Sequence, residues 1–332
     1  MGETNLQVLL ARRPTGAPQE SDFRLVETAV PEIGDGQFLV RSHYLSLDPY
    51  MRGRMNDAKS YAKPAQLGEV MVGGAVGEVA TSRHPKFKPG DKVVGPFGWQ
   101  LYAVSDGAGV RVVDPRVPLP AYLGALGMPG VTAYIGLLDF GEPKAGETVV
   151  VSAASGAVGA VVGQIAKIRS CRAVGIAGGP DKCRYVVEEL GLDACVDYKA
   201  GRLWEDLSQA TPKGIDVYFD NVGGEILDTV LRRLNSFARI PLCGLVSQYN
   251  ATEPYAMKNA GALLVNRVKL QGFIVTDHLP RWPAALADLA LWLSEGKIKY
   301  RETVAEGLRS APSAFIGMLA GKNFGKQLVK LI

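Results

Sequence analysis

Cysteine is scarce in this chain, which has four cysteines among 332 residues. They are Cys171, Cys183, Cys195 and Cys243, all in the second half, and none forms a C-x-x-C pair. Scattered cysteines of this kind are typical of buried free thiols in a reducing compartment rather than of a disulfide framework. We therefore expect a cytoplasmic protein.

The first half also lacks metal ligands. It contains no cysteine before Cys171, and its only histidines are His43 and His84. A tetrahedral zinc site with three protein ligands cannot be built from these residues at a plausible spacing. We expect no metal, a strand position for His43 and a loop position for His84.

Strong charge and long apolar segments are missing too. The formal net charge is +4, and Lys and Arg are scattered along the chain, so nucleic acid is not an expected partner. The N-terminus does not resemble a signal peptide. The apolar stretch 149–166 contains glycines, serines and Gln164, which predicts a strand and a helix rather than a membrane span. The expected partner is a small molecule, with no membrane.

The length predicts two domains, because single cores stop growing near about 250–300 residues. Residues 1–120 have β-branched patterns between glycines and prolines, with strands at 38–44 and 74–79 and a turn at 88–91 that starts another. From about residue 121, strands and helices alternate, which predicts an α/β fold with a doubly wound parallel sheet. The expected strands are 148–152, 172–177, 195–197, 216–220, 239–243 and 269–275, and the expected helices are 157–168, 181–190, 224–234 and 283–295.

A glycine-rich turn follows the first of these parallel strands. The sequence Ser152-Ala153-Ala154-Ser155-Gly156-Ala157-Val158-Gly159 leads into a helix that also contains Gly163. Gly156 would let the backbone turn and approach a pyrophosphate, and Gly159 and Gly163 would let the helix pack closely. The spacing differs from the common G-x-G-x-x-G, so the strand before the turn and the helix after it carry the prediction of a dinucleotide site.

The second strand indicates which nucleotide binds. In NAD-binding folds, an acidic residue at the end of this strand holds the ribose 2′-hydroxyl. Here the strand ends in Gly178 and Gly179, which leave room for a 2′-phosphate, and Lys182 and nearby Arg184 can neutralise it. Asp181 follows a proline and is expected to cap the next helix. These residues favour NADPH.

Seven motifs occur in order along nearly the whole chain. Together they resemble the medium-chain dehydrogenase/reductase superfamily, in its zinc-free group of leukotriene B4 dehydrogenases, prostaglandin reductases, curcumin reductases and other NADPH-dependent alkenal/one double-bond reductases. The motifs are Leu47-Asp48-Pro49-Tyr50-Met51-Arg52, Gly127-Met128-Pro129-Gly130-Val131-Thr132-Ala133-Tyr134, the turn 153–163, Asp197-Tyr198-Lys199, Tyr218-Phe219-Asp220-Asn221-Val222-Gly223-Gly224, Cys243-Gly244-Leu245-Val246-Ser247-Gln248-Tyr249-Asn250 and Asn323-Phe324-Gly325-Lys326.

The resemblance implies a domain plan and a cofactor site. Residues 1–122 and 300–332 would form a GroES-like β-rich catalytic domain, and 123–299 a Rossmann NADPH-binding domain. Backbone N–H groups of Ala157 to Ala160 would bind the pyrophosphate, and Lys182 and Tyr198 the 2′-phosphate. Phe273-Ile274-Val275 and Asn323 would close on the nicotinamide and diphosphate, and the other residues would line the cofactor. The implied cofactor residues are Thr132, Gly156, Ala157, Val158, Gly159, Ala160, Gly178, Gly179, Lys182, Tyr198, Asn221, Cys243, Gly244, Leu245, Val246, Ser247, Gln248, Tyr249, Phe273, Ile274, Val275 and Asn323.

The missing metal also bears on the reaction. Zinc-dependent relatives need a Gly-His-Glu, and the corresponding region here is Gly68-Glu69-Val70. Without a Lewis acid, oxidation of an unactivated alcohol is disfavoured. Reduction of a carbon–carbon double bond next to a carbonyl suits the chain better, because the substrate carries its own electron sink. We expect a hydride transfer to the β-carbon of an enone or enal.

Tyr249 is the expected catalytic residue. Its phenol stays protonated at neutral pH and can donate a hydrogen bond to the developing enolate, together with the cofactor ribose. The alternative is an aromatic ring that only fills the domain seam. Substrate-binding residues are expected to be Tyr50, Tyr61, Met51, Arg52 and Met128. Tyr61 could equally be a surface residue, and Arg52 could meet an acidic substrate group or a carboxylate of the protein.

Two other functions remain open at this stage. A quinone reductase without zinc would use the same cofactor in a more open cleft, and a non-enzymatic NADPH-binding structural protein would keep the glycine turn but not need Tyr249. A homodimer is expected from the resemblance, with the segment 269–275 as a sheet edge that could join two copies.

Overall fold

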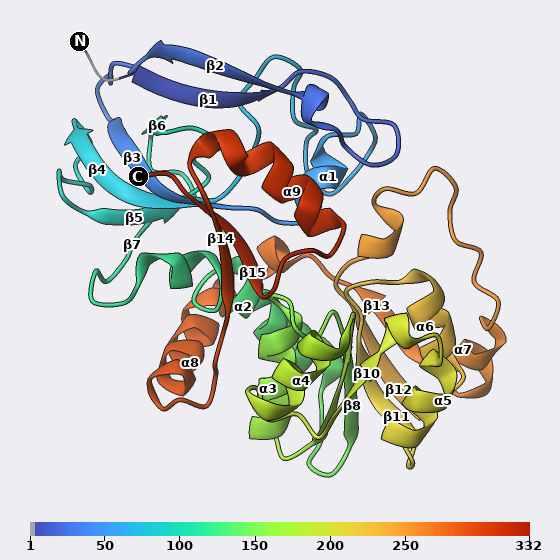
Figure 1. The fold of residues 1–332 in the computed structure, drawn as a ribbon. Coiled ribbons are helices and arrows are strands. Elements are labelled where there is room, and N and C mark those ends of the chain that lie inside the picture. The colour runs from blue at the N-terminus through green and yellow to red at the C-terminus, as the bar shows by residue number, and fades with distance from the viewer. Residues whose placement is uncertain (1–3) are drawn as a thin grey trace. The chain divides into compact units, whose positions relative to one another are not determined.

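The computed structural model describes residues 4–332. Their strands form three β-sheets (Figure 1). The chain divides into two units, one formed by the chain up to Leu123 together with Glu302–Ile332, and one formed by Gly124–Arg301. No helix among the described residues is both long and apolar enough to cross a membrane.

The first unit is β-rich. A hairpin joins β1 (Thr4–Leu10) and β2 (Phe23–Ala29) in antiparallel register. A seven-stranded sheet has the order β14-β15-β3-β4-β5-β7, with β6 also paired to β3. Its strands are β3 (Phe38–Ser46), β4 (Ala75–Ser82), β5 (Lys92–Gly95), β6 (Tyr102–Ser105), β7 (Arg111–Val112), β14 (Glu302–Glu306) and β15 (Lys326–Lys330).

Aromatic residues fill the core of this unit. The rings of Phe23 and Trp99 stack at 5.5 Å, and Phe315 of α9 (Ala311–Leu319) meets both edge to face. The C-terminal strand β15 pairs with β3 in antiparallel register, so the tail completes the N-terminal sheet as the sequence predicts. Short helices complete the unit: η1 (Glu20–Asp22), α1 (Tyr50–Arg54), η2 (Leu119–Leu123) and η7 (Leu308–Ser310).

The second unit is a parallel six-stranded sheet with helices between its strands, and this confirms the predicted fold class. The strand order β10-β9-β8-β11-β12-β13 reverses direction at β8, as in doubly wound folds. The strands are β8 (Thr148–Ser152), β9 (Arg172–Ala177), β10 (Ala194–Asp197), β11 (Ile215–Phe219), β12 (Leu234–Leu242) and β13 (Lys269–Gly272). The helices are α2 (Met128–Ile135) with its π-helical extension η3 (Gly136–Gly141), α3 (Gly159–Ile168), α4 (Pro180–Glu188), η4 (Tyr198–Ala200), α5 (Leu203–Ala210), α6 (Gly224–Leu231), η5 (Val246–Gln248), α7 (Gly261–Val265), η6 (Val275–Arg281) and α8 (Trp282–Ser294).

Several predicted boundaries differ from those observed, and three of them lie in the parallel-sheet unit close to the expected site. The helix expected from residue 157 begins at Gly159, because the glycine turn occupies two more residues. The strand expected at 239–243 begins earlier, at Leu234, where the preceding helix was expected to end. The strand expected to reach Val275 ends at Gly272, and Val275 begins a 3₁₀ helix.

Candidate active site

The glycine turn lies between β8 and α3. Position 159 requires glycine because the backbone of Ala153 passes close to it. A Cβ on Gly159 would lie 2.3 Å from the carbonyl oxygen of Ala153, so no other residue fits there. The tight backbone conformation falls on Ala153, which has φ 52°, and not on Gly156 as expected. Gly163 gives close packing against Leu192, since a Cβ would lie 2.7 Å from Leu192 Cδ2.

The turn leaves backbone N–H groups for an anion. Gly156 N–H donates to Ala153 O at 2.9 Å, and Ala160 N–H donates to Gly156 O at 3.0 Å. Ala160, one of the predicted pyrophosphate donors, therefore already uses its N–H group inside the turn. Ala157, Val158 and Gly159 lie at the N-terminal end of α3, where the first N–H groups of a helix have no acceptor within the helix and can bind an anion.

The ends of β9 and β10 are tied together by Asp197. Its Oδ1 accepts hydrogen bonds from Gly179 N at 2.8 Å and from Lys199 N at 2.9 Å. Gly179 is the N-cap residue of α4 and has φ 102°, which a residue with a side chain rarely adopts. The expectation that Asp181 caps α4 is wrong: it is exposed and pairs with Arg184 at 3.3 Å, while the acid at the end of the neighbouring strand holds Gly179.

Three predicted cofactor residues meet at this corner. A Cβ on Gly178 would lie 2.8 Å from Tyr198 Cε1, so the phenol ring packs directly over the glycine. Burial, and then the positive charge of Lys199, lower the pKa of Lys182. Lys199 Nζ lies 5.9 Å from the centre of the Tyr198 ring. Burial and the nearby charge of Lys199 both disfavour the charged form of Lys182, and a bound 2′-phosphate would favour it.

A buried carboxylate organises the neighbouring strand ends. Asp220 Oδ1 accepts hydrogen bonds from Tyr218 OH at 2.8 Å, Ser152 Oγ at 3.0 Å, Val222 N at 2.9 Å and Gly223 N at 3.0 Å. Burial raises the pKa of Asp220, although these donors oppose the shift. Its backbone carbonyl accepts from Cys243 N at 2.8 Å, so one residue joins β8, β11 and the loop after β12.

Asn221 and the loop after β12 are held against each other by backbone hydrogen bonds. Asn221 donates from Nδ2 to Ser152 O at 2.8 Å, and its own carbonyl accepts from Val246 N at 3.2 Å. Ser247 Oγ donates to Val222 O at 2.7 Å. The predicted segment Cys243–Tyr249 therefore lies over the 221–224 turn, at the carboxyl edge of the sheet where ligands bind.

Tyr249 is half-buried in this loop. Its hydroxyl accepts a long hydrogen bond, 3.4 Å, from Leu245 N. A Cβ on Gly244 would lie 3.1 Å from the same hydroxyl, so the phenol lies across the glycine backbone. A hydroxyl that accepts from the backbone keeps its own proton for donation.

Other predicted residues of the second unit are engaged in the protein. Thr132 Oγ1 donates to Met128 O at 2.7 Å, and the Met128 side chain is half-buried. The Phe273 ring stacks on Phe140 at 4.9 Å, so it belongs to the core and only its backbone is left for a cofactor. Ile274 is half-buried and Val275 is buried.

The predicted substrate residues of the first unit have different environments. Burial, followed by the charge of Asp48, raises the pKa of Tyr50. Met51 is fully buried in the core, so its expected role as a substrate wall is not supported. Arg52 donates to Gly16 O at 2.7 Å and to Asn56 Oδ1 at 2.6 Å, so a backbone carbonyl and an amide oxygen hold its guanidinium rather than a carboxylate of the protein. Tyr61 is 61% exposed.

A buried ion pair fixes the start of α1. Lys326 Nζ donates to Asp48 Oδ1 at 2.8 Å and to Leu47 O at 2.6 Å, and Ser46 Oγ donates to the other carboxylate oxygen. Both charged side chains are less than 10% exposed. This pair joins two of the sequence motifs and holds the segment that carries Tyr50.

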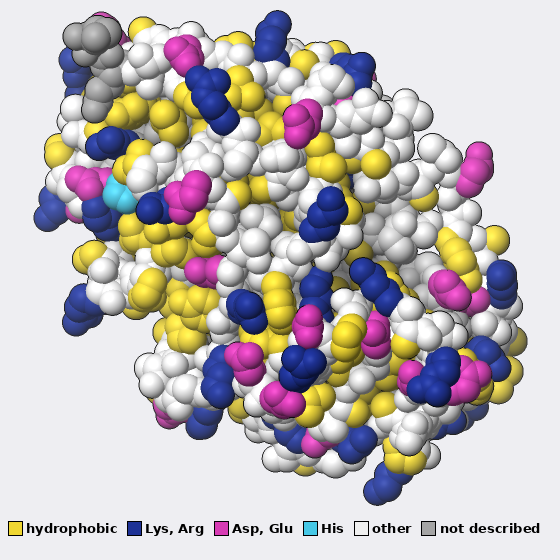
Figure 2. Space-filling model, viewed as in Figure 1, with side chains coloured by type: hydrophobic (Ala, Val, Ile, Leu, Met, Phe, Trp, Pro, Cys, Tyr) yellow, Lys and Arg dark blue, Asp and Glu magenta, His cyan; other side chains and the backbone are white. Residues whose placement is uncertain are grey.

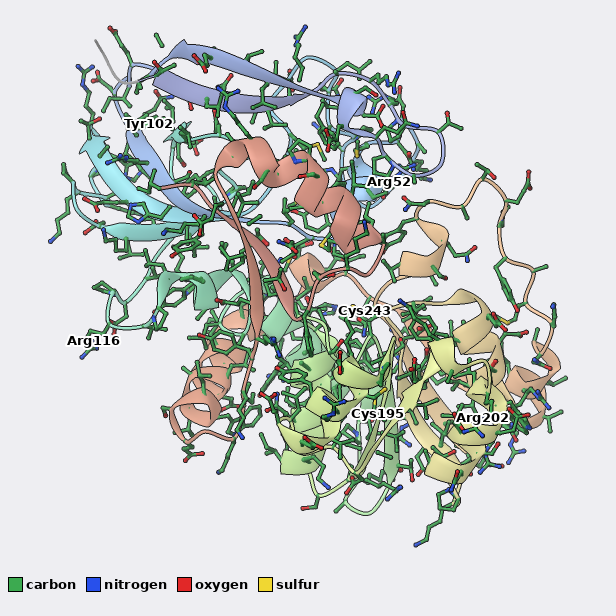
Figure 3. All side chains as sticks on the ribbon, viewed as in Figure 1. Arg52, Tyr102, Arg116, Cys195, Arg202 and Cys243 are labelled. Carbon is green, nitrogen blue, oxygen red and sulfur yellow. The ribbon has the colours of Figure 1, made fainter. Side chains whose placement is uncertain are left out.

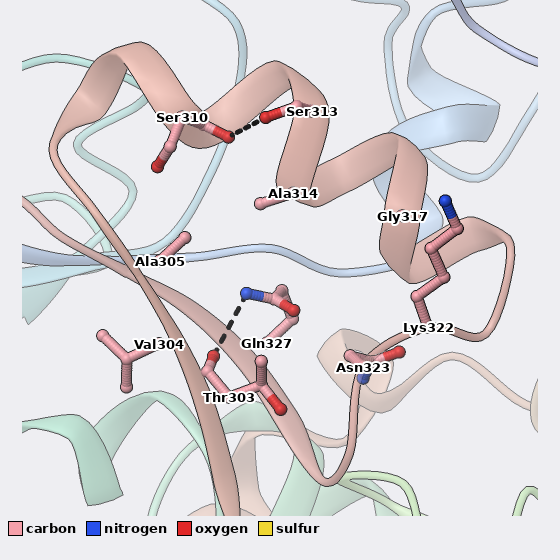
Figure 4. A pocket seen from close by; sticks show the side chains of 10 residues that line it. All are labelled: Thr303, Val304, Ala305, Ser310, Ser313, Ala314, Gly317, Lys322, Asn323 and Gln327. Atoms are coloured by element: carbon pink, nitrogen blue, oxygen red, sulfur yellow. Dashed lines mark hydrogen bonds between the residues drawn. The ribbon is translucent and has the colours of Figure 1, made fainter.

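Asn323 lines a cavity of about 310 Å³ beside β14, β15 and α9 (Figure 4). Its Nδ2 donates to Gly325 O at 2.8 Å. The cavity walls are Thr303, Val304, Ala305, Ser310, Ser313, Ala314, Gly317, Lys322, Asn323 and Gln327. The two serines donate to backbone carbonyls of their own segment, and Gln327 Nε2 donates to Thr303 O of β14 at 3.1 Å, so these polar side chains of the walls have partners within the protein.

Among residues 4–332, no group of three or more His, Cys, Asp or Glu side chains is placed to hold a metal ion. His43 lies on β3, where burial lowers its pKa, and His84 lies in a loop against Phe38. On the face shown in Figure 2, basic and acidic side chains are interspersed, in keeping with the scattered charge of the sequence.

Asp197, Lys199 and Asp220 were not assigned roles from the sequence. All three belong to motifs that carried the resemblance, and each stands at or just after the end of a parallel strand. That position, where neighbouring strands end at one edge, is the signal that could have identified them.

A glycine turn, an anion-binding helix end and a lysine pair at the next strands define a dinucleotide-binding oxidoreductase of the NADP type. Residues 6–113 match the family described as the N-terminal domain of oxidoreductase, and residues 157–291 match the family described as zinc-binding dehydrogenase. The chain is 50% identical to the NADPH-dependent curcumin reductase of Escherichia coli (strain K12), covering 99% of this chain and 97% of that protein.

Two further comparisons extend this result. The chain is 42% identical to the NADP⁺-dependent 2-alkenal reductase of Nicotiana tabacum, over 98% of this chain and 97% of the relative. The crystal structure of CurA from Vibrio vulnificus in complex with NADPH matches with a TM-score of 0.95 and 50% identity, over 98% of this chain and 99% of that one. The chain belongs to the medium-chain dehydrogenase/reductase superfamily, in the group of NADPH-dependent alkenal/one reductases, as the sequence predicts.

Proposed function

We propose that this protein uses NADPH to reduce the carbon–carbon double bond of α,β-unsaturated ketones and aldehydes. The observation that carries the proposal is the similarity, over nearly the full length, to relatives named for reduction of curcumin and of 2-alkenals. The lysine pair at the end of β9 and β10 supports the cofactor, because a 2′-phosphate relieves the repulsion between Lys182 and Lys199.

The residues of the second unit provide a consistent cofactor site. Ala157, Val158 and Gly159 would donate backbone N–H groups to the pyrophosphate, and Lys182, Tyr198 and Lys199 would hold the 2′-phosphate. Asn221 and the Cys243–Tyr249 loop would line the remainder. NADPH, when bound, supplies the hydride that adds to the β-carbon.

Tyr249 would stabilise the negative charge that develops on the substrate's carbonyl oxygen. The hydroxyl is held over Gly244 by the Leu245 N–H, and a donor already in position costs little reorganisation as the charge forms. Protonation of the α-carbon then completes the saturated ketone or aldehyde.

The direct test follows NADPH oxidation with an alkyl vinyl ketone, a 2-alkenal and benzoquinone. We expect turnover of the first two with a saturated carbonyl product identified by mass spectrometry, and activity that persists after dialysis against a strong chelator. Turnover of benzoquinone alone would support a quinone reductase. Absence of a single turnover with every enone would support a non-enzymatic NADPH-binding protein.

We also propose a homodimer. β13 is the last strand in its sheet order, so one of its edges has no strand partner among the described residues. The side chains of Phe237, Leu264 and Val265 are exposed in the segments that precede β13. An apolar surface next to an open strand edge is suited to pairing with a second copy.

A further inference from the structure

Two cysteines that the proposed reaction does not use lie in contact. Cys183 is in α4 and Cys195 is in β10, twelve residues later in the chain, and their sulfur atoms are 2.9 Å apart. Cys195 is the donor in this contact and Cys183 the acceptor. Cys195 is labelled in Figure 3. Cys171 has a different partner, since its Sγ donates to Lys144 O at 3.2 Å.

The fold explains why these two side chains meet. Cys195 is paired with Gly175 across the β9–β10 register. A Cβ on Gly175 would lie 3.5 Å from Cys195 Sγ and 2.8 Å from Val186 Cγ1, so the glycine lets α4 approach the sheet. Cys183 is in the first turn of α4, where its N–H donates to Gly179 O at 3.2 Å.

The two thiols have different reactivities. The hydrogen bond from Cys195 lowers the pKa of the Cys183 thiol, and the position near a helix N-terminus favours the same thiolate. Donation of that hydrogen bond, together with burial, raises the pKa of Cys195. Cys183 is therefore the attacking thiol, and Cys195 is placed to resolve the product. Burial also raises the pKa of Cys171, and that of Cys243 to about 12, so neither competes.

We propose that Cys183 and Cys195 are a redox modification site that a small disulfide oxidises to a protein disulfide, and that this bond weakens NADPH binding. The Cys183 thiolate attacks one sulfur of the small disulfide and displaces the other as a thiol. Cys195 then attacks the mixed disulfide and displaces the second thiol. The protein loses two electrons and two protons, and the small disulfide becomes two thiols.

The effect on NADPH follows from what the two segments carry, and it rests on the proposed function. Gly179 caps α4 and Lys182 lies in its first turn, while β10 ends at Asp197 and is followed directly by Tyr198. A disulfide requires the sulfurs to approach by about 0.9 Å from their present separation to about 2.05 Å. The disulfide would link α4, which carries Lys182, to β10, which is followed by Tyr198. Pulling these two segments together moves Lys182 away from the position in which it can donate a charge-assisted hydrogen bond to the 2′-phosphate.

The test equilibrates the protein in mixtures of reduced and oxidised glutathione. We expect loss of two titratable thiols, a Cys183–Cys195 cross-linked peptide in the mass spectrum, and recovery with excess dithiothreitol. The NADPH dissociation constant, measured by cofactor fluorescence, should rise about 3–10-fold on oxidation, because sites tolerate only about 0.5 Å of displacement. The NADH constant should change little, since NADH has no 2′-phosphate.

Single substitutions separate the two thiols. Cys195→Ser should trap a stable glutathione adduct on Cys183, and Cys183→Ser should form almost none. Cys171→Ser is the matched control and should behave as the wild type. No cross-link under strongly oxidising conditions, or a cross-link with unchanged NADPH affinity, would overturn the proposal. Thiol counts and peptide masses do not depend on NADPH, so failure of the proposed function would appear separately, as weak NADPH binding by the reduced protein.

Discussion

Lys182 is a cation that the fold keeps partly out of water and beside a second cation, Lys199. Burial and a neighbouring positive charge both disfavour a protonated lysine, so this arrangement is expected where the lysine binds an anion. Removing its charge should therefore affect the ligand that needs it more than it affects the protein. The same reasoning applies to any ligand with a phosphate at this corner.

Lys182→Ala should weaken NADPH binding about 10–100-fold, since a hydrogen bond to a charged group contributes about 1.5–3 kcal/mol. NADH binding should be nearly unchanged. Lys213→Ala, at an exposed lysine of the same unit, is the control and should leave both constants unaltered. Equal losses for the two nucleotides, measured by fluorescence titration, would remove Lys182 from this role.

The lowered pKa of Lys182 also predicts a pH dependence. The bound phosphate favours the charged lysine, so NADPH affinity should fall as pH rises through this lowered pKa toward the ordinary value of 10.5. Stability of the protein without cofactor has the opposite slope: the unfolded chain binds this proton more tightly, so this contribution to stability rises with pH in the same window. Titration of the NADPH dissociation constant from neutral pH to about pH 10 should show the fall in the wild type and not in Lys182→Ala. A fall of equal size in that variant would contradict the assignment.

Tyr249→Phe keeps the ring and removes only the hydroxyl. If the hydroxyl donates to the developing enolate, the rate should fall toward the lower end of about 10²–10³-fold, the effect typical of losing one oxyanion donor. NADPH affinity should change little. If the ring only packs, the Phe variant should keep nearly full turnover and Tyr249→Ala should be damaged. Single-turnover hydride transfer, followed at the NADPH absorbance, distinguishes the two.

At the scale of elements, Asp220 joins β8, β11 and the loop after β12 through one carboxylate and one carbonyl. Asp220→Ala should lower the free energy of unfolding by about 3–5 kcal/mol, because several buried donors lose their acceptor. Asp220→Asn keeps one acceptor oxygen and should cost less than half as much. Urea denaturation measures both, and equal stability of the Ala variant and the wild type would show that these donors find other acceptors.

Four of the six parallel strands could be predicted from the sequence to within one residue. β8 and β9 have the expected bounds, because a run of apolar residues followed by serine or glycine marks where each strand ends. The hairpin of β1 and β2 was not predicted, since neither strand alone has a clear alternation of apolar and polar residues and only their pairing explains them. α5 was missed for the same reason: only Leu207 of the helix is buried.

Individual contacts were harder to predict than elements. The position of Asp197 at the end of a strand was visible, but its acceptance of the Gly179 N–H depends on how β9 and β10 align. The contact of Cys183 with Cys195 depends on the missing side chain at Gly175, in a third element. Met51 lies between Tyr50 and Arg52 in a motif expected to contact substrate, so the sequence alone does not distinguish a substrate contact from a core position. Only the packing of the first unit shows that Met51 belongs to the core.

At the scale of the whole molecule, the exposed apolar residues that precede β13 suggest how two copies would associate in the proposed homodimer. Leu264 is 82% exposed and Val265 is 68% exposed, which is unusual for large apolar side chains next to an open strand edge. Phe237 lies beside them in the chain fold, since its N–H donates to Asn266 O at 2.7 Å. If a second copy covers this surface about a two-fold axis, β13 of one chain pairs with β13 of the other, and both apolar surfaces are buried together.

Sedimentation equilibrium at micromolar concentration should therefore give twice the chain mass of 35.5 kDa. Leu264→Asp should shift the protein toward the monomer, because each dimer would then bury two charges at one surface. Leu67→Asp replaces a 52% exposed leucine of the first unit and should leave the mass unchanged. A wild-type monomer would contradict the dimer. A dimer that Leu264→Asp does not weaken would show that the copies meet elsewhere. An aspartate at the centre of an apolar contact stays hydrated only if the two chains separate.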